Sequence, residues 1–246
     1  MGNRFLISFS YEGTNFHGYQ KQGKLRTVQK EIEIVLKKIN NNQTITIYAV
    51  SRTDKKVHAL NQFAHFDLKI NIKPDKLKRA MNTYLPEDIY IKTVKIVPAD
   101  FYARYRAKKK EYEYIIETGE YDLFQRNYIY YFPHKLNIYQ IKKALKQLKG
   151  EHDFTSFVSA EETRKNKIRT IYKASVKKKK TLIYFNFQGN GFLKYQIRNM
   201  IGTLLMVGLG KKKPEDIKVI LEKKDRRSAN KTANPEGLYL KNIWFD

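Results

Sequence analysis

The order of strand and helix patterns limits the folds open to this chain, because the same order occurs twice. Residues 4–11 alternate apolar and polar side chains, as a half-buried strand does. Thr27 can cap a helical pattern, and a proline opens a second one at position 74. The elements predicted for the first half are strands 4–11, 44–50, 62–68 and 89–97, with helices 28–39 and 74–84. Their order is β-α-β-β-α-β.

The second half follows the same order with one inserted helix. Residues 109–117 and 238–245 have the alternation of strands, and Asn137 can cap a helix with an apolar stripe. Two further strands, 168–177 and 181–188, are predicted to form a hairpin. The remaining helices are predicted at 192–209 and, as the insertion, at 214–223.

Each half therefore fits the split β-α-β unit, in which both helices cover one face of an antiparallel sheet. We predict an α+β fold of two ferredoxin-like or RRM-like halves, residues 1–105 and 106–246, that share an extended antiparallel sheet with a central cleft. Such a fold leaves a broad sheet face free for RNA and makes the cleft the natural site.

The chain is strongly basic. Its 246 residues include 49 Lys and Arg against 24 Asp and Glu, a formal charge of +25. This excess repels itself unless a polyanion neutralises it, and nucleic acid is the obvious polyanion. The 18 Tyr and 14 Phe suit RNA, whose splayed bases stack on aromatic rings. An anionic membrane surface and a generally lysine-rich proteome are the alternatives.

The chain has no cysteine, which excludes disulfides, thiolate nucleophiles and cysteine-ligated metal sites. Its five histidines show no metal-binding spacing, and we expect hydrogen-bonded structural roles for His58 and His65. The first strand follows no apolar signal segment, and no stretch reaches the length of a membrane span. These features predict a soluble cytoplasmic protein with no membrane partner.

Asp54 is the strongest candidate for a catalytic group. It lies with Arg52 in a polar turn between two predicted strands, although a turn aspartate is often only a structural cap. Arg198, flanked by apolar residues, is expected near the buried side of its helix, where it needs an anionic partner. Pairing with it would keep Asp54 ionised. Tyr112, on a strand with alternate tyrosines, either packs in the core or stacks on a base.

Motifs along nearly the whole chain resemble those of the bacterial tRNA pseudouridine synthase A (TruA) family. They are Tyr11-Glu12-Gly13, Phe16-His17-Gly18-Tyr19-Gln20, Thr27-Val28-Gln29, Arg52-Thr53-Asp54, Val57-His58, Phe101-Tyr102-Ala103-Arg104-Tyr105, Tyr112-Glu113-Tyr114, Asp153-Phe154-Thr155-Ser156-Phe157, the Phe192 to Gly202 helix and Glu236-Gly237-Leu238-Tyr239-Leu240. The resemblance implies a pseudouridine synthase fold and an isomerase that converts uridine to pseudouridine in the tRNA anticodon arm, at about positions 38 to 40. It also implies a homodimer that uses no metal and no cofactor.

The resemblance assigns a role to five residues. Asp54 matches the aspartate that attacks the flipped nucleotide, and Arg198 matches the arginine that pairs with it. Tyr112 matches the active-site tyrosine against the base, and Leu238 the aliphatic residue that packs on the target ring. Arg52 matches an arginine associated with expelling and holding the nucleotide.

The chain departs from the family around Asp54. Members usually carry Gly or Ala at the position of Ser51 and small residues such as Ala-Gly where this chain has Lys55-Lys56. A lost glycine could change the turn, and two added cations could alter which RNA fits. The same chemistry on ribosomal RNA or at other tRNA positions therefore stays open. A non-catalytic RNA-binding protein of the same fold is the other alternative, and intact Asp54, Arg198 and Tyr112 argue against it.

Overall fold

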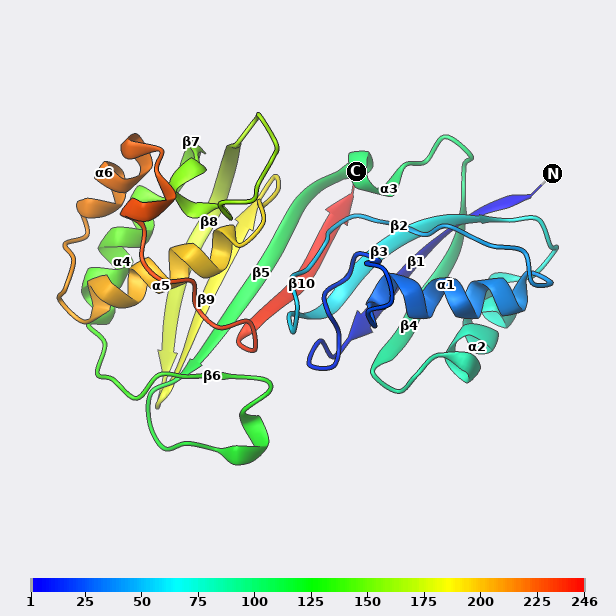
Figure 1. The fold of residues 1–246 in the computed structure, drawn as a ribbon, viewed down its shortest axis with the longest axis horizontal. Coiled ribbons are helices and arrows are strands. Elements are labelled where there is room, and N and C mark those ends of the chain that lie inside the picture. The colour runs from blue at the N-terminus through cyan, green and yellow to red at the C-terminus, as the bar shows by residue number, and fades with distance from the viewer. Residues whose placement is uncertain (1, 246) are drawn as a thin grey trace. The chain divides into compact units, whose positions relative to one another are not determined.

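The computed structural model describes residues 2–245, which form a mixed α+β structure with ten strands and six helices (Figure 1). These residues divide into two compact units. One runs up to Lys108 and includes the chain from Tyr239 onward, and the other spans Lys109–Leu238. The predicted division, 1–105 and 106–246, differs in that the closing strand groups with the first unit.

The first unit is a sheet flanked by two amphipathic helices. Its elements are β1 (Asn3–Tyr11), α1 (Val28–Ile39), β2 (Tyr48–Ala49), β3 (His58–Leu68), α2 (Pro74–Tyr84), β4 (Ile89–Val97) and the short α3 (Ala103–Arg106), with β10 (Leu238–Phe245) except its first residue, Leu238. The strand order is β4-β1-β3, and both β2 and β10 pair with β3. Because β10 runs parallel to β3, the expectation of a wholly antiparallel sheet is wrong at this strand.

Local sequence explains these elements. In β1, Phe5, Ile7 and Phe9 are fully buried on one face, as the alternation predicts. The Thr27 hydroxyl accepts a hydrogen bond from the Lys30 N–H at 3.4 Å and so caps α1. The helix α2 begins at Pro74, where a missing N–H costs no helical hydrogen bond. The predicted bounds of α2 and β4 are confirmed.

The predicted strand 44–50 is wrong in extent, since only Tyr48–Ala49 pair as β2. Just before it, the Ile47 N–H lies 3.4 Å from the Glu33 carboxylate of α1 and donates to that side chain instead of to a strand. Asn41 and Asn42 have positive φ angles, 51° and 64°, which turn the chain out of α1. Together these features leave room for only a short pairing with β3.

The second unit places helices against a sheet of five strands. Its elements are β5 (Ala107–Glu117), β6 (Tyr130–Tyr131), α4 (Ile138–Gln147), β7 (Gly150–Asp153), β8 (Ile168–Lys179), β9 (Leu182–Gly189), α5 (Gln196–Gly208) and α6 (Asp216–Lys223). The strand order is β5-β9-β8-β7, with β6 parallel to β5. The predicted β8–β9 hairpin and the Asn137 cap of α4 are confirmed. The α5 helix starts later than predicted because Tyr195 is left-handed, with φ 64°.

Half-buried Arg226 ties the segment after α6 to α5. One guanidinium nitrogen, Nη2, donates to Asn199 Oδ1 at 3.0 Å, to the Asn230 carbonyl at 3.0 Å and to Thr232 Oγ1 at 3.2 Å. Burial lowers the pKa of Arg226. The segment lies so close to α5 that a Cβ added to Gly202 would be 1.9 Å from the Lys231 carbonyl oxygen.

Replacing Arg226 by methionine should lower the free energy of unfolding by about 2 kcal/mol. The substitution leaves part-buried acceptors without a donor, and each such acceptor costs about 1–3 kcal/mol. The control is Arg227→Met, since the Arg227 side chain is 91% exposed and pairs with Asp225. That variant should leave the midpoint of urea unfolding almost unchanged. Equal shifts for the two variants would contradict the role given to Arg226.

Candidate functional site

The residues singled out from the sequence lie in both compact units. Arg52 and Asp54 belong to the first unit, in the turn between β2 and β3. Tyr112, Arg198 and Leu238 belong to the second unit. Each group has its own supporting contacts.

The turn that carries Asp54 is anchored first by a buried amide of β3. Gln62, which is fully buried, donates from Nε2 to the Ser51 carbonyl at 2.8 Å and accepts from the Ser51 N–H at 3.3 Å. The Val50 N–H donates to the Phe63 carbonyl at 2.9 Å. These bonds fix where the chain leaves β2, three residues before Asp54.

The loop after β1 holds the other side of the same turn. The Tyr19 N–H donates to the Thr53 carbonyl at 3.1 Å, and the Lys56 N–H donates to the Phe16 carbonyl at 3.2 Å. Between the end of β1 and the turn, the Tyr11 hydroxyl and Thr53 Oγ1 lie 2.7 Å apart and share a hydrogen bond. The half-exposed Asp54 therefore projects from a backbone that is bonded on both sides.

Two glycines make this packing possible. Gly18 has φ 89°, and a Cβ there would lie 2.9 Å from the Thr53 carbonyl oxygen. A Cβ on Gly13 would lie 2.2 Å from the Val57 carbonyl oxygen. Any side chain at either position would push the loop away from the Asp54 turn.

His58 and His65 have the hydrogen-bonded structural roles that the sequence predicts. The Gly13 N–H donates to His58 Nδ1 at 3.0 Å, so that nitrogen carries no proton, and the buried ring stacks on Tyr239 with centroids 4.7 Å apart. The Ala103 N–H donates to His65 Nδ1 at 3.4 Å. Burial lowers the pKa of His65, which favours its neutral form.

Tyr19 is a residue near the turn that the sequence argument did not single out. Its ring is 2% exposed, and its hydroxyl has no hydrogen-bond partner within residues 2–245. Burial raises the pKa of Tyr19 well above its ordinary value, and the positive charge of Arg52 opposes that rise. Tyr19 lies in the same sequence motif as Phe16 and Gly18, and that motif was the signal that could have identified it as a residue near the site.

In the second unit, Tyr112 lies on the buried face of β5. Its side chain is 7% exposed, and its ring meets Phe192 edge to face with centroids 5.2 Å apart. Tyr114 follows on the same face and donates from its hydroxyl to the Asn234 carbonyl at 2.6 Å. Burial raises the pKa of Tyr114 well above its ordinary value. Tyr112 thus borders a closely packed aromatic layer.

Arg198 lies in the first turn of α5 and is half-exposed, so the expectation of a position near the buried side needs correction. Its Nε donates to the Ala233 carbonyl at 2.8 Å, and the Ala233 N–H donates to the Arg198 carbonyl at 3.1 Å. The guanidinium carbon lies 5.0 Å from the centroid of the Tyr195 ring. The side chain is held between the helix, this ring and the segment at Ala233.

One segment, residues 233–238, connects the candidate residues of the second unit. It accepts from Arg198 at Ala233, from the Tyr114 hydroxyl at Asn234 and from the Ile115 N–H at Gly237, the last at 2.9 Å. It ends at Leu238, which is 5% exposed and opens β10. The structure thereby ties Arg198, β5 and Leu238 to one short stretch of chain.

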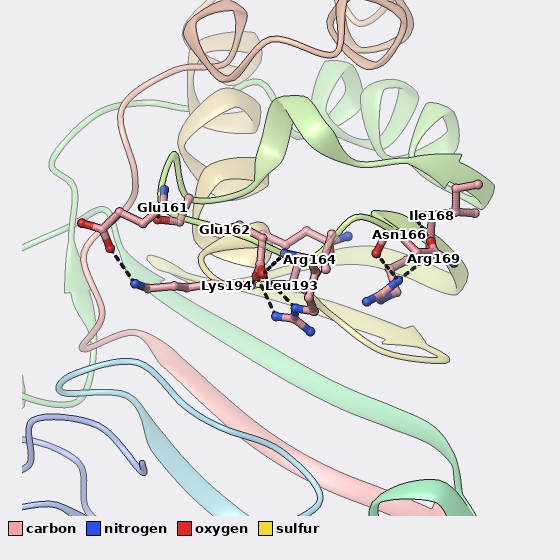
Figure 2. Close-up of polar contacts among 10 residues, drawn as sticks. Glu161, Glu162, Arg164, Asn166, Ile168, Arg169, Leu193 and Lys194 are labelled. Carbon is pink, nitrogen blue, oxygen red and sulfur yellow. Dashed lines mark hydrogen bonds and ion pairs between the residues drawn. The ribbon is translucent and has the colours of Figure 1, made fainter. Parts of the chain in front are cut away.

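A loop before β8 supports the entrance to α5, as Figure 2 shows. The Glu162 carboxylate accepts from Arg164 Nε at 2.9 Å and Nη2 at 2.7 Å, and from the Lys194 N–H at 3.5 Å. Chiefly through the Arg164 hydrogen bonds, the pKa of Glu162 is lowered to about 2. Glu161 pairs with Lys194 Nζ at 2.8 Å. No sequence pattern pointed to this cluster.

No group of three or more His, Cys, Asp or Glu that could hold a metal occurs within residues 2–245. Over the same range, none of the helices has the length and apolar character needed to cross a membrane.

Comparison with known proteins gives concordant matches over the chain. A family model described as tRNA pseudouridine synthase matches residues 7–106 and 144–246. Proteins named tRNA pseudouridine synthase A are similar to this chain in Geobacillus sp. (strain WCH70), 44% identical over 100% of both chains, and in Streptococcus pneumoniae (strain Taiwan19F-14), 44% identical over 99% of both.

A solved structure of a Cbf5-Nop10-Gar1 complex aligns over 81% of this chain and 54% of that chain, with 14% identity and a TM-score of 0.35. The family match covers most of the sequence, and the relatives match it end to end. The chain therefore belongs to the tRNA pseudouridine synthase family.

Proposed function

We propose that this isomerase converts uridine to pseudouridine in the anticodon stem-loop of tRNA, at about positions 38 to 40, with Asp54 as the attacking carboxylate. The observation that carries the proposal is the half-exposed carboxylate on a turn whose backbone is hydrogen-bonded on both sides. A reacting group held this way meets its substrate in one geometry, which lowers the entropic cost of the reaction.

The reaction rearranges atoms within one nucleotide. Asp54 attacks the flipped nucleotide, and the bond between N1 and C1′ breaks. The uracil turns, and a bond forms between C5 and C1′ while the bond between Asp54 and the nucleotide breaks. The proton on C5 is lost while N1 gains one. Atoms and electrons balance without an oxidant, a reductant or a second substrate.

The family resemblance gives the other roles in this proposal. Arg198 pairs with Asp54 and keeps it ionised, and Tyr112 lies against the base. Leu238 packs on the target ring, and Arg52 holds the expelled nucleotide. The fixed positions of Arg198 and Leu238 on segment 233–238 are what these roles require. The resemblance also supports a homodimer as the working form.

A row of lysines in the second unit supports a polyanionic substrate. Lys173, Lys177 and Lys179 stand opposite Gln188, Tyr184 and Leu182 of β9, so their side chains share one face of the sheet. Neither these three nor Lys178 and Lys180 make an ion pair with any described residue. Lysines on the part of β8 that β7 does not pair also hinder aggregation, and a polyanion would relieve their mutual repulsion.

The departure from the family at Lys56 is compatible with the family's turn. Lys56 adopts a left-handed conformation, with φ 64°, at a position where members usually carry a small residue. The lysine therefore follows the backbone path that glycine would favour, at some conformational cost. On this basis the added cations change the charge beside Asp54 rather than the path of the turn.

Asp54→Asn should lower the rate of pseudouridine formation by at least about 10⁴-fold, as loss of a nucleophile does. The Kd for tRNA should stay within about twofold, because the amide keeps the size of the carboxylate. Single-turnover rates and filter binding measure the two quantities. Asp75→Asn, in the exposed first turn of α2, is the control. An Asp54→Asn enzyme that still turns over would remove Asp54 from the mechanism.

Replacing both Lys177 and Lys179 by glutamine should reduce the slope of log Kd for tRNA against log salt concentration by about 1.5. Each lost phosphate contact lowers that slope by roughly 0.7–0.9, because fewer counterions are released on binding. The matched control is Lys142→Gln with Lys146→Gln on the exposed face of α4, which removes the same charge. Equal slopes for the two double variants would exclude the β8 lysines from the RNA-binding surface.

Lys56→Gly should leave both the target uridine and the rate unchanged, because glycine fits the left-handed backbone already present. The substitution should raise the free energy of unfolding by roughly 0.5 kcal/mol. It removes the cost of holding a residue with a side chain in the left-handed conformation, and the greater conformational entropy of glycine in the unfolded chain offsets part of that gain. Pseudouridine mapping and urea unfolding provide the readouts. A changed target would show that Lys56 selects the RNA.

A further inference from the structure

We propose that Glu162 is a positioning residue for Arg198, because it fixes the chain at Lys194 and Tyr195 from which α5 and Arg198 start. The inference rests on the proposed function of Arg198. Glu162 acts on Arg198 through the backbone between them.

Lys194 is held at three points by the loop that carries Glu162, and Figure 2 draws Lys194 with Glu161 and Glu162. Its N–H points to the Glu162 carboxylate at 3.5 Å, and its carbonyl accepts from the Ser159 N–H at 3.0 Å. Its ammonium pairs with Glu161 at 2.8 Å. The two backbone contacts set the direction in which the chain enters Tyr195.

Tyr195 needs such support because its backbone is strained. Its φ of 64° and ψ of 0° place it in the left-handed region, which costs a residue with a side chain free energy and persists where the surroundings enforce it. The Asn199 N–H donates to the Tyr195 carbonyl at 2.9 Å, so the strained residue forms the start of α5. Its ring then lies 5.0 Å from the Arg198 guanidinium carbon.

Glu162 is suited to this task and Glu161 is not. The Glu162 side chain is 7% exposed and accepts from the Arg164 N–H, from two guanidinium nitrogens and from the Lys194 N–H. The Glu161 side chain is 79% exposed and pairs with the Lys194 ammonium, whose side chain is 40% exposed. An exposed pair of this kind contributes little, whereas a buried acceptor facing several donors fixes them.

The two neighbouring glutamates give a matched pair of variants. Glu162→Gln puts an amide NH2 among donors that need an acceptor, so the Lys194–Tyr195 turn should loosen. Pseudouridine formation in single turnovers should slow by about 10- to 100-fold, as a displaced catalytic group does. The Kd for tRNA should change by less than about threefold. Glu161→Gln, which removes the same charge, should retain nearly the full rate.

A double-mutant cycle with Arg198→Met separates positioning from general damage. If Glu162 acts through Arg198, Glu162→Gln should slow the Arg198→Met enzyme by less than about twofold, because the group it positions is already gone. Similar losses in both backgrounds would overturn the proposal and leave the role of Arg198 standing. A fully active Arg198→Met enzyme would overturn the proposed role of Arg198 and this inference with it.

Arg164→Met provides a second test if Glu162→Gln does not fold. It removes the two guanidinium bonds but leaves the Glu162 carboxylate free to accept from Lys194. The rate should fall by less than about 10-fold, and the loss should disappear in the Arg198→Met background. A loss that persists there would contradict the proposal.

Discussion

The hydrogen bonding of the Asp54 turn is the constraint on which the first unit's part of the site depends. A carboxylate that must attack a flipped nucleotide has to keep its direction, and a surface turn by itself does not ensure that. Here the buried amide of Gln62 holds one end. Two bonds join the turn to the loop after β1, from the Lys56 N–H to the Phe16 carbonyl and from the Tyr19 N–H to the Thr53 carbonyl. Close approach at Gly13 and Gly18 allows these bonds.

In the second unit, a different element holds the proposed site residues in place. Segment 233–238 is bound by α5 on one side and by β5 on the other, so Arg198 and Leu238 have fixed positions relative to that segment. Arg226 secures the preceding residues through uncharged acceptors, and Glu162 secures the entrance to α5. Much of the polar interior of this unit thus serves to hold short stretches of chain around Arg198.

Local patterns in the sequence were sufficient for most helices and strands. Thr27, Pro74 and Asn137 mark helix starts by their own chemistry, and the alternation in β1 and β5 follows from burial of one face. Local patterns could not predict three features: the short β2, the left-handed backbone of Tyr195 and the half-exposed position of Arg198. Each depends on contacts with residues far away in the sequence. Glu162 could not be predicted because a glutamate in a charged loop has no distinguishing neighbours in sequence.

Mapping of pseudouridine in RNA would identify the target. The purified protein would be incubated, without added cofactor, with unmodified tRNA and with ribosomal RNA, and modified positions would be read in both. We expect pseudouridine confined to the tRNA anticodon stem-loop, at about positions 38 to 40. Pseudouridine only in ribosomal RNA, or only elsewhere in tRNA, would contradict the proposed target, and none in either RNA would contradict the proposed activity.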